Sequence, residues 1–336
     1  MVLALLPVIL QMIVISWPVS VDANAGDEKV PVVWKDLGTR RGGVDWPRFL
    51  GPDGTSFSPE KGILKNWKQD GLRLVWQLPL GTGYSMPVVS KGRLYQFDRQ
   101  GDNARLRCLK SETGEALWAF ECATSYEDFY GYNNGPRCSP VVNDGRVYIY
   151  GPEGMLHCLD AVSGVLLWKL DTFTKFGVVQ NFFGVGSTPV VEGDLLIVQV
   201  GGSPAGEGRS PTMRQKGNGS GIVAFDKKTG GVRYRSTDEL ASYASPVLAT
   251  IKGRRWCFVF ARRGLVGFDP TNGKVDFHFP WRARVLESVN ASDPLVIGDL
   301  VFLTECYGPG SVLLRVEPGA AEVVWSDAEQ RLEKAM

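Results

Sequence analysis

The residues of this chain best suited to bind a polar ligand are aromatic, amide and arginine side chains in a few long, varied segments. Aromatic rings stack on flat groups, while amides and guanidinium groups beside them supply hydrogen bonds. The main segments are 125–137, 175–183, 201–219 and 280–290, with shorter ones at 262–263 and 305–307. From these segments and the residues that adjoin them we predict a ligand-binding face composed of Tyr130, Asn133, Asn134, Arg137, Gln180, Asn181, Arg262, Arg263, Trp281, Arg282, Asn290, Asp293 and Glu305.

The sequence contains few candidate catalytic residues and no catalytic motif. Asp293 and Glu305 can serve as an acid and base pair, but their spacing in sequence does not set their distance in space. The two histidines, His157 and His278, belong to no cluster of metal ligands, and we interpret both as packing residues. The chain lacks a Gly-x-Ser-x-Gly elbow, a Cys-x-x-Cys pair and a nucleotide-binding glycine motif. We therefore assign no catalytic residue from the sequence, predict no metal site, and favour a protein that is not an enzyme.

The long segments separate copies of a pattern that recurs five times. Each copy starts at a serine and proline before an apolar run, with the prolines at Pro87, Pro140, Pro189, Pro246 and Pro294. A repeat of this period indicates one supersecondary unit copied around an axis. In the copy 139–168, turn residues separate four apolar runs, 140–142, 146–150, 155–160 and 165–168, which are typical of antiparallel strands. We predict an all-β fold, a β-propeller of four-stranded antiparallel blades at about 84–118, 137–168, 186–234, 243–277 and 290–325.

Each fourth strand ends on a large aromatic residue, and a turn of the type Asp-x-x-Thr-Gly precedes that strand. We expect glycine to take the left-handed conformation there and the aspartate to accept hydrogen bonds from the turn amides. The long connections then share one face of the propeller, where binding usually occurs. The aromatic residues are expected to pack between blades rather than to bind a ligand: Trp76, Trp118, Trp168, Tyr234, Phe277 and Trp325.

The motif seen at 160–168 and 226–230 resembles the PQQ-like repeat, which builds the eight-bladed propellers of quinoprotein alcohol dehydrogenases and of the propeller subunit of the barrel-assembly machinery. The segment Asp45–Gly54 resembles the lead-in of exported PQQ-like proteins common in planctomycete-type bacteria. The resemblance covers about 45–325 and is specific for the fold. For a dehydrogenase it implies pyrroloquinoline quinone (PQQ) with Ca²⁺ in the central funnel, an aspartate base and an adjacent pair of cysteines. This chain has no adjacent cysteines.

The first residues predict export. Residues 2–21 carry no charge, and Ala23-Asn24-Ala25 has the pattern of a signal-peptidase site, so we predict a signal peptide at 1–25. A retained membrane anchor is the alternative; no later stretch is long and apolar enough to span a bilayer. The signal peptide places the mature protein in the periplasm or outside the cell. With 37 basic and 36 acidic residues interspersed, nucleic acid is not an expected partner.

The six cysteines are Cys108, Cys122, Cys138, Cys158, Cys257 and Cys306. Cys108 and Cys158 occupy one slot of successive repeats, which favours small, buried free thiols. A bridge between Cys122 and Cys138 is the alternative.

Residues 74–76 read as an extra fourth strand before the first repeat, after a lead-in at 26–73. Only a tail, 326–336, follows Trp325. We therefore expect an incomplete seven- or eight-bladed ring rather than a closed ring of five, with an open edge that needs covering.

From these observations we expect an exported binding or scaffold module, without cofactor, that holds a protein or a small polar ligand on its loop face. The alternatives are a PQQ-dependent oxidoreductase and a glycan-binding or glycan-active propeller.

Overall fold

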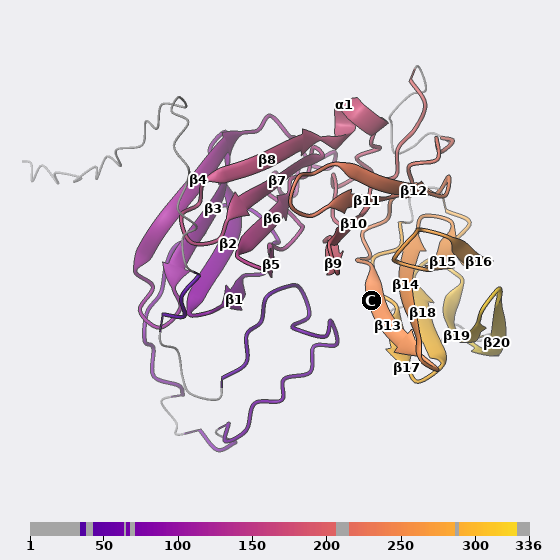
Figure 1. Ribbon diagram of the computed structural model, residues 1–336, viewed down its shortest axis with the longest axis horizontal. Helices are drawn as coiled ribbons and strands as arrows, with labels where there is room; N and C mark the ends of the chain where they lie inside the picture. Colours follow the sequence, from indigo (N-terminus) through magenta and orange to yellow (C-terminus); the bar gives the residue numbers. More distant parts are fainter. Residues whose placement is uncertain are drawn as a thin grey trace, which may run out of the picture. The chain divides into compact units, whose positions relative to one another are not determined.

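The computed structural model describes residues 34–37, 43–63, 65–67, 71–205, 215–285 and 289–327. The predicted signal peptide and residues 328–336 lie outside this part of the chain. Residues from Trp34 onward belong to one compact unit. Within it the described strands form five four-stranded antiparallel sheets, each in the order of the chain, as the repeat predicts. Figure 1 shows these sheets following one another as the blades of a β-propeller.

The strands of the five sheets have the following bounds. The first two sheets contain β1 (Val88–Ser90), β2 (Arg93–Gln100), β3 (Asn103–Lys110) and β4 (Ala116–Ala123), then β5 (Val141–Asn143), β6 (Arg146–Tyr150), β7 (Met155–Asp160) and β8 (Leu166–Asp171). The third and fourth contain β9 (Val190–Glu192), β10 (Leu195–Gln199), β11 (Ile222–Asp226) and β12 (Val232–Ser236), then β13 (Val247–Ile251), β14 (Arg254–Ala261), β15 (Gly264–Phe268) and β16 (Val275–Pro280). The fifth contains β17 (Leu295–Ile297), β18 (Leu300–Glu305), β19 (Gly310–Glu317) and β20 (Ala320–Ser326).

One helix occurs in the described residues, and the sequence pattern did not indicate it. The helix α1 (Thr172–Phe176) lies in the connection between the second and third sheets. Asp171 caps it by accepting from the backbone N–H of Thr174 at 2.9 Å, and Gly177 ends it in the left-handed conformation. No helix of the described part is long and apolar enough to cross a bilayer.

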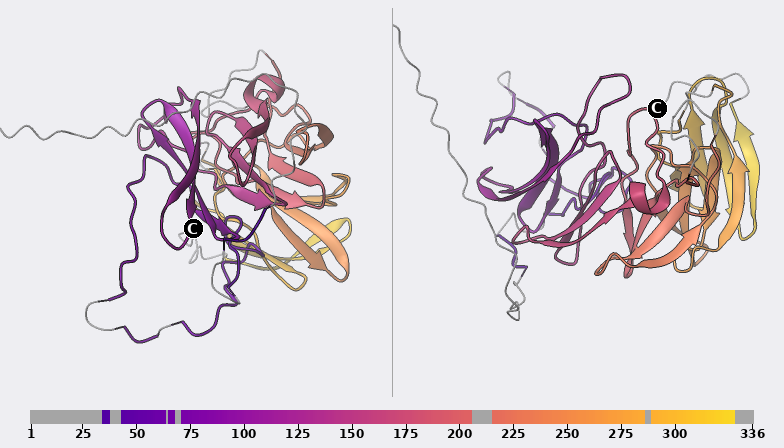
Figure 2. Two further views of the ribbon diagram at one scale, coloured as in Figure 1. Left: turned by 60° about the vertical axis from the view of Figure 1, so that its left-hand side comes forward. Right: turned by 90° about the horizontal axis from the view of Figure 1, so that it is seen from above.

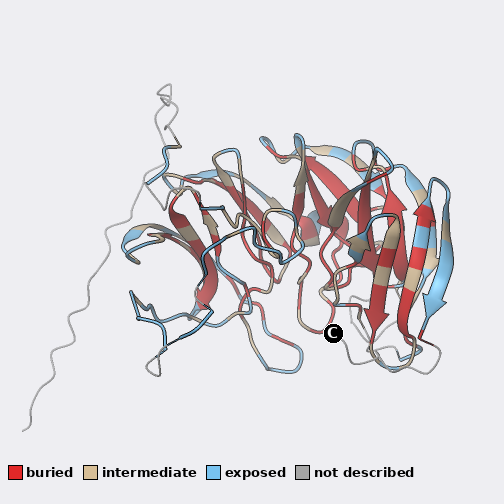
Figure 3. Ribbon diagram, turned by 90° about the horizontal axis from the view of Figure 1, so that it is seen from below, coloured by how far each residue is buried: buried red, intermediate tan, exposed pale blue. Residues whose placement is uncertain are grey.

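The hydrophobic core lies between the sheets rather than at one centre. Four clusters of buried side chains each draw residues from two neighbouring sheets, the first from sheets one and two and the last from sheets four and five. The second and third strands of most sheets are therefore buried on both faces, while the fourth strands stay largely exposed. Figure 3 shows this gradient, with red inner strands and a pale outermost strand on the fifth sheet.

The predicted turn chemistry is present. Asp226 accepts from the backbone amides of Lys228 and Thr229, both at 2.9 Å, and Gly230 has a φ of 72°. A register shift between the third and fourth strands follows the same slot in every sheet, as between Cys158 and Leu159 in the second. The repeat thus preserves a bulge as well as the strands, and the bulge precedes the turn that receives the aromatic ring of the preceding blade.

In the first four repeats this ring lies on the glycine of the turn. A Cβ built on Gly164 would meet Trp118 at 2.6 Å, and one built on Gly230 would meet Trp168 at 2.9 Å. Tyr234 covers Gly273 in the same way. The ring fits because glycine has no side chain, so this contact seals one blade against the next.

The lead-in differs from our expectation at 74–76. These residues form no strand, because no neighbouring strand among the described residues pairs with them. Trp76 nevertheless takes the sealing position: its ring covers Gly114, and its indole N–H donates to the Ser111 carbonyl at 3.0 Å. Figure 2 shows this part of the lead-in, in indigo to purple, as a long loop without regular structure.

Residues 45–56 of the lead-in form a compact loop, which we call the lead-in loop, against β1 and β5, the first strands of the first two sheets. Trp46 pairs with Val89 of β1, and the Val142 amide of β5 donates to the Pro47 carbonyl at 2.8 Å. The lead-in loop is compact because the indole of Trp46 lies over Gly51, which has a φ of 83°. The lead-in motif is therefore an inner lining that joins the first two sheets.

Candidate functional site

The loop between β4 and β5 is organised around a buried carboxylate. Asp128 forms an ion pair with Arg137 and accepts from the Tyr130 amide at 2.8 Å. Its own backbone amide donates to the Asn134 side chain at 2.8 Å. The side chain of Asp128 is 0% exposed, and that of Arg137 is 9% exposed. The two charges therefore hold the loop from inside, which is a positioning role rather than ligand contact.

The other predicted residues of this loop also support its shape. Arg137 donates to the carbonyls of Gly135 at 2.6 Å and Asn133 at 2.8 Å, and its guanidinium lies 5.5 Å from the Tyr126 ring centre. The Asn133 side chain accepts from the Gly135 amide at 2.8 Å. These contacts leave Tyr130 as the predicted residue of the loop whose side chain reaches the surface, 47% exposed.

The loop that follows α1 packs directly on the first loop. The Phe129 amide donates to the Phe182 carbonyl at 3.2 Å, and the Phe183 amide donates to the Tyr243 hydroxyl at 2.9 Å. The second loop therefore links the first to the connection after β12.

The two loops together carry a stack of aromatic rings, which we call the aromatic patch: Phe129, Tyr130, Tyr132, Phe182 and Phe183. Tyr130 lies at its centre, 5.9 Å from Tyr132 at an interplanar angle of 27° and 5.7 Å from Phe182 at 20°. Phe129 meets Tyr130 edge to face at 5.1 Å. Phe129 is 57% and Tyr132 is 72% exposed, whereas Phe182 is buried. The patch thus consists of three exposed rings that lie over the buried Phe182 and the half-buried Phe183.

Apart from Tyr130, the members of the patch were missing from the predicted site residues, although the segments that carry them were singled out. The signal was the repeated occurrence of aromatic residues in two connections expected on one face. Sequence alone did not show that amides and arginines of the same segments turn inward.

Three other predicted residues form buried links. Asn181 donates to the Ala241 carbonyl at 2.9 Å and accepts from the Arg262 guanidinium at 3.0 Å, and Gln180 donates to the Glu153 carbonyl at 3.2 Å. Burial, together with the positive charge of Arg282, lowers the pKa of Arg262 to about 10. These contacts join connections from different sheets.

The predicted residues of the fourth and fifth sheets lie in a second polar cluster. The buried Glu239 accepts from Arg263 Nε at 2.8 Å and from His278 Nε2 at 3.0 Å. Burial opposes ionisation of Glu239, but donation from His278 and Arg263 holds its pKa below the usual range. Asn290 donates to the Ala261 carbonyl at 2.7 Å, and Trp281 donates to the Gly310 carbonyl at 3.2 Å. Glu305 is buried, and its charge raises the pKa of Arg282 against a larger lowering by burial.

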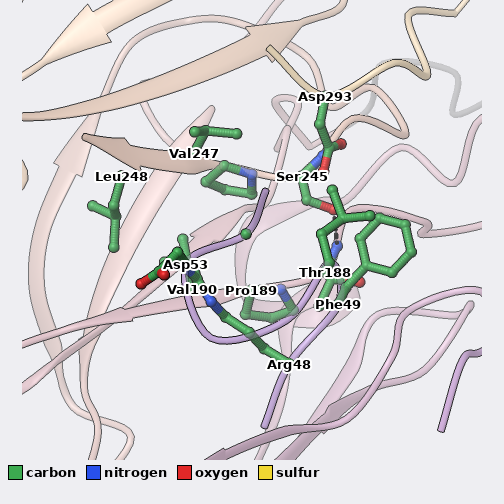
Figure 4. A pocket seen from close by; sticks show the side chains of 13 residues that line it. Arg48, Phe49, Asp53, Thr188, Pro189, Val190, Ser245, Val247, Leu248 and Asp293 are labelled. Carbon is green, nitrogen blue, oxygen red and sulfur yellow. Dashed lines mark hydrogen bonds between the residues drawn. The ribbon is translucent and has the colours of Figure 1, made fainter. Parts of the chain in front are cut away.

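The remaining predicted carboxylate, Asp293, lies at the start of the fifth sheet, just before β17. It accepts from the Ser245 amide at 2.6 Å and lines a small cavity with Thr188 and with Arg48 and Phe49 of the lead-in. Figure 4 shows Asp293 beside Ser245, with Phe49 and Thr188 on the same side.

Both histidines make the kind of contact expected of structural residues. His157 is buried against Phe120, with ring centres 5.4 Å apart, and burial lowers its pKa to about 4. All six cysteines are free thiols in the structure, four of them buried.

The described residues of the loop face show no cluster of acidic side chains that would hold Ca²⁺ beside a quinone. Calcium takes six to eight oxygen ligands, several of them carboxylates. In the described residues no three His, Cys, Asp or Glu side chains converge on one point. Two buried carboxylates of the face are engaged by basic side chains, Asp128 by Arg137 and Glu239 by Arg263 and His278.

Comparison with known proteins places this geometry among PQQ-like repeats. Residues 102–279 match the family described as outer membrane protein assembly factor BamB. The dehydrogenase subunit of the quinone alcohol dehydrogenase of Komagataeibacter europaeus is 26% identical over 175 residues, which cover 49% of this chain and 21% of that protein. BamB of Yersinia pestis is 30% identical over 132 residues, 36% of this chain and 31% of that protein.

The solved structure of quinohemoprotein alcohol dehydrogenase from Comamonas testosteroni shares the fold, with a TM-score of 0.55 at 16% identity over 81% of this chain and 46% of that one. The matched part spans between about a fifth and a third of the curated relatives' own length.

Proposed function

The chain belongs to the family of PQQ-like repeats described as outer membrane protein assembly factor BamB, and on that premise we propose that it is a binding module that holds a protein partner on its aromatic patch. The observation that carries this proposal is the exposure of Phe129, Tyr130 and Tyr132 on loops that internal hydrogen bonds hold in place. The remainder of the repeated structure acts as scaffold.

The physical reason is the low cost of binding to such a patch. Exposed aromatic rings offer large apolar area together with hydroxyl groups, and Tyr and Trp dominate the binding energy of protein interfaces. A loop that is already ordered loses little conformational entropy when a partner binds. Asp128, buried and paired with Arg137, supplies that order before any partner arrives.

The proposal includes export. The apolar leader and its Ala23-Asn24-Ala25 site favour the periplasm or the cell exterior, and the description of the family refers to outer-membrane proteins. In that setting the module would act on another envelope protein.

Site-specific photo-crosslinking tests the proposal in cells. A photoreactive phenylalanine analogue at position 132 should give one discrete adduct with an envelope protein, identified by mass spectrometry. The matched control is the same analogue at Phe57, an exposed aromatic residue of the lead-in with 71% exposure. Equal adducts from both positions, or none from position 132, would reject the aromatic patch as the binding surface.

A further inference from the structure

We call the interface between two neighbouring sheets a seam. Three of the seams are closed in the same way, with an aromatic ring on a turn glycine and a tyrosine hydroxyl that donates a hydrogen bond to the next sheet. Tyr95 donates to the Ala161 carbonyl at 2.9 Å, and Tyr148 donates to the Lys227 carbonyl at 3.0 Å. Tyr234 serves both purposes at the third seam, donating to the Pro270 carbonyl at 2.8 Å. Each seam therefore has a directional bond beside its apolar core.

The fourth seam, between the fourth and fifth sheets, has no ring on its turn glycine, and the Trp281 indole donates across it to the Gly310 carbonyl at 3.2 Å instead. Phe277 lies over its own sheet, because Gly267 opposite it has no side chain: a Cβ there would meet the Phe277 ring at 2.4 Å. The Phe277 ring lies tilted against that of Trp256 of the same sheet, with ring centres 6.1 Å apart and an interplanar angle of 47°. Gly319, the turn glycine of the fifth sheet, has no described atom within 4 Å of its Cβ position.

A second set of contacts joins all the sheets near their first strands. In each repeat, the residue before the proline donates its backbone N–H to the side chain of its counterpart in the next repeat. The donors and acceptors are Met86 to Ser139 at 3.0 Å, Ser139 to Thr188 at 3.1 Å, Thr188 to Ser245 at 3.2 Å, and Ser245 to Asp293 at 2.6 Å. Three of the acceptors are neutral hydroxyls; only at the fourth seam is the acceptor ionisable.

We propose that Asp293 makes the fourth seam a pH-sensitive hinge, closed when its carboxyl group is protonated and more readily opened when it is ionised. The seam without a ring on its turn glycine is therefore also the one at which the acceptor of this bond can ionise. The inference rests on the seam's own contacts and is independent of the proposed function.

The surroundings of Asp293 favour the neutral acid. Of the residues that line its cavity, the charged ones besides Asp293 are Arg48 and Asp53 of the lead-in, and the segments contributed by the third and fourth sheets are uncharged. Arg48 donates through Nε to the carbonyls of Gly51 and Pro52, at 3.2 and 3.1 Å, and its charge interacts with Asp53, Arg255 and Glu192. Burial raises the pKa of Asp293 to about 7, against a smaller lowering by the Ser245 amide.

The direction of the effect follows from proton linkage. The closed seam holds a proton that the opened seam releases, since an exposed aspartate has a pKa near 3.9. Closing is therefore favoured at low pH, and that advantage is lost as the pH rises toward and through about 7. The equilibrium constant for opening should rise about tenfold between pH 6 and pH 8 and then level off.

Hydrogen–deuterium exchange of the full chain, corrected for the intrinsic pH dependence of amide exchange, measures this opening directly. In the wild type, amides of β17–β19 should show the tenfold rise, and amides of β5–β7 should not. Asp293→Asn keeps the shape and accepts the same bond but does not ionise, so its corrected exchange should be flat over this range. A flat wild-type profile, or an equal rise in Asp293→Asn, would overturn the hinge.

A second variant guards against a folding defect in the first. Asp293→Ser introduces the hydroxyl acceptor that the chain already has at Ser139 and Ser245. The hydrogen bond from the Ser245 amide can therefore form in this variant as it does at the other seams. Its corrected exchange in β17–β19 should also be independent of pH. Persistence of the rise in Asp293→Ser would assign the pH dependence to another group and reject the proposal.

Discussion

The seal between the second and third sheets offers a direct stability test. Gly230 and Gly253 both have positive φ, 72° and 78°, so a change to alanine at either site incurs a similar backbone penalty of about 1 kcal/mol. They differ in what the new methyl group would meet. At Gly230 it would lie 2.9 Å from the Trp168 ring, whereas at Gly253 there is no described atom within 4 Å.

The additional cost at Gly230 comes from displacement of that ring. Overpacking costs about 1–3 kcal/mol, and loss of the bond from the Trp168 indole to the Lys227 carbonyl, 3.3 Å, costs about 1 kcal/mol more. We therefore expect Gly230→Ala to lower the free energy of unfolding by about 4 kcal/mol and Gly253→Ala by about 1 kcal/mol. Urea unfolding followed by tryptophan fluorescence measures both.

The comparison of Gly230→Ala with Gly253→Ala can also refute the role of the Trp168 ring. If the two substitutions cost the same, the ring does not seal the seam, and the repeated aromatic residues need another explanation. Repeating Gly230→Ala in a Trp168→Leu background sharpens the test, because most of the excess cost should vanish when the ring is absent.

Three further predictions follow from other contacts. Arg137→Leu leaves the buried Asp128 without its ion pair and should cost about 3 kcal/mol in unfolding free energy, with Arg137→Lys recovering part of it; equal losses would mean that the pair does not organise the loop. Burial raises the pKa of Cys108 and Cys158 to about 12, so a thiol reagent at pH 8 should modify neither until urea unfolds the chain, and rapid labelling of the native protein would contradict their burial. Adding PQQ with Ca²⁺ should leave the melting temperature unchanged, since Asp128 and Glu239 are already engaged, and a rise would reopen the quinoprotein alternative.

Much of the fold was predictable because the same pattern of strands and turns occurs in five repeats. The second and third strands of the second repeat, 146–150 and 155–160, agree with β6 and β7, since turn residues on both sides delimit them. The behaviour of Asp226 and Gly230 was predictable for the same reason: short-range turn chemistry depends on neighbouring residues alone.

What was not predictable depends on partners distant in sequence. Residues 74–76 have the pattern of a strand, but a strand needs a neighbour, and Trp76 alone keeps its place on Gly114. Phe277 has the same position in the repeat as Trp168, yet the absent side chain of Gly267 lets it fold back on its own sheet.

The candidate site shows the same limit. Asn181, Arg262 and Asn290 have the chemistry of ligand contacts, but each is buried in bonds to a carbonyl or amide of another connection. Composition identified the segments, and only the contacts between them separated the exposed rings from the residues that hold them.

The measurement that tests the central claim most directly is the affinity of the crosslinked partner for wild type and for the double substitution Tyr130→Ala/Tyr132→Ala, by calorimetry. Two exposed aromatic anchors at the centre of an interface contribute about 2 kcal/mol each, so affinity should fall by at least about 100-fold. The melting temperature should stay near that of wild type, because both side chains are largely exposed. Unchanged affinity in the double variant would contradict the assignment of binding to the aromatic patch.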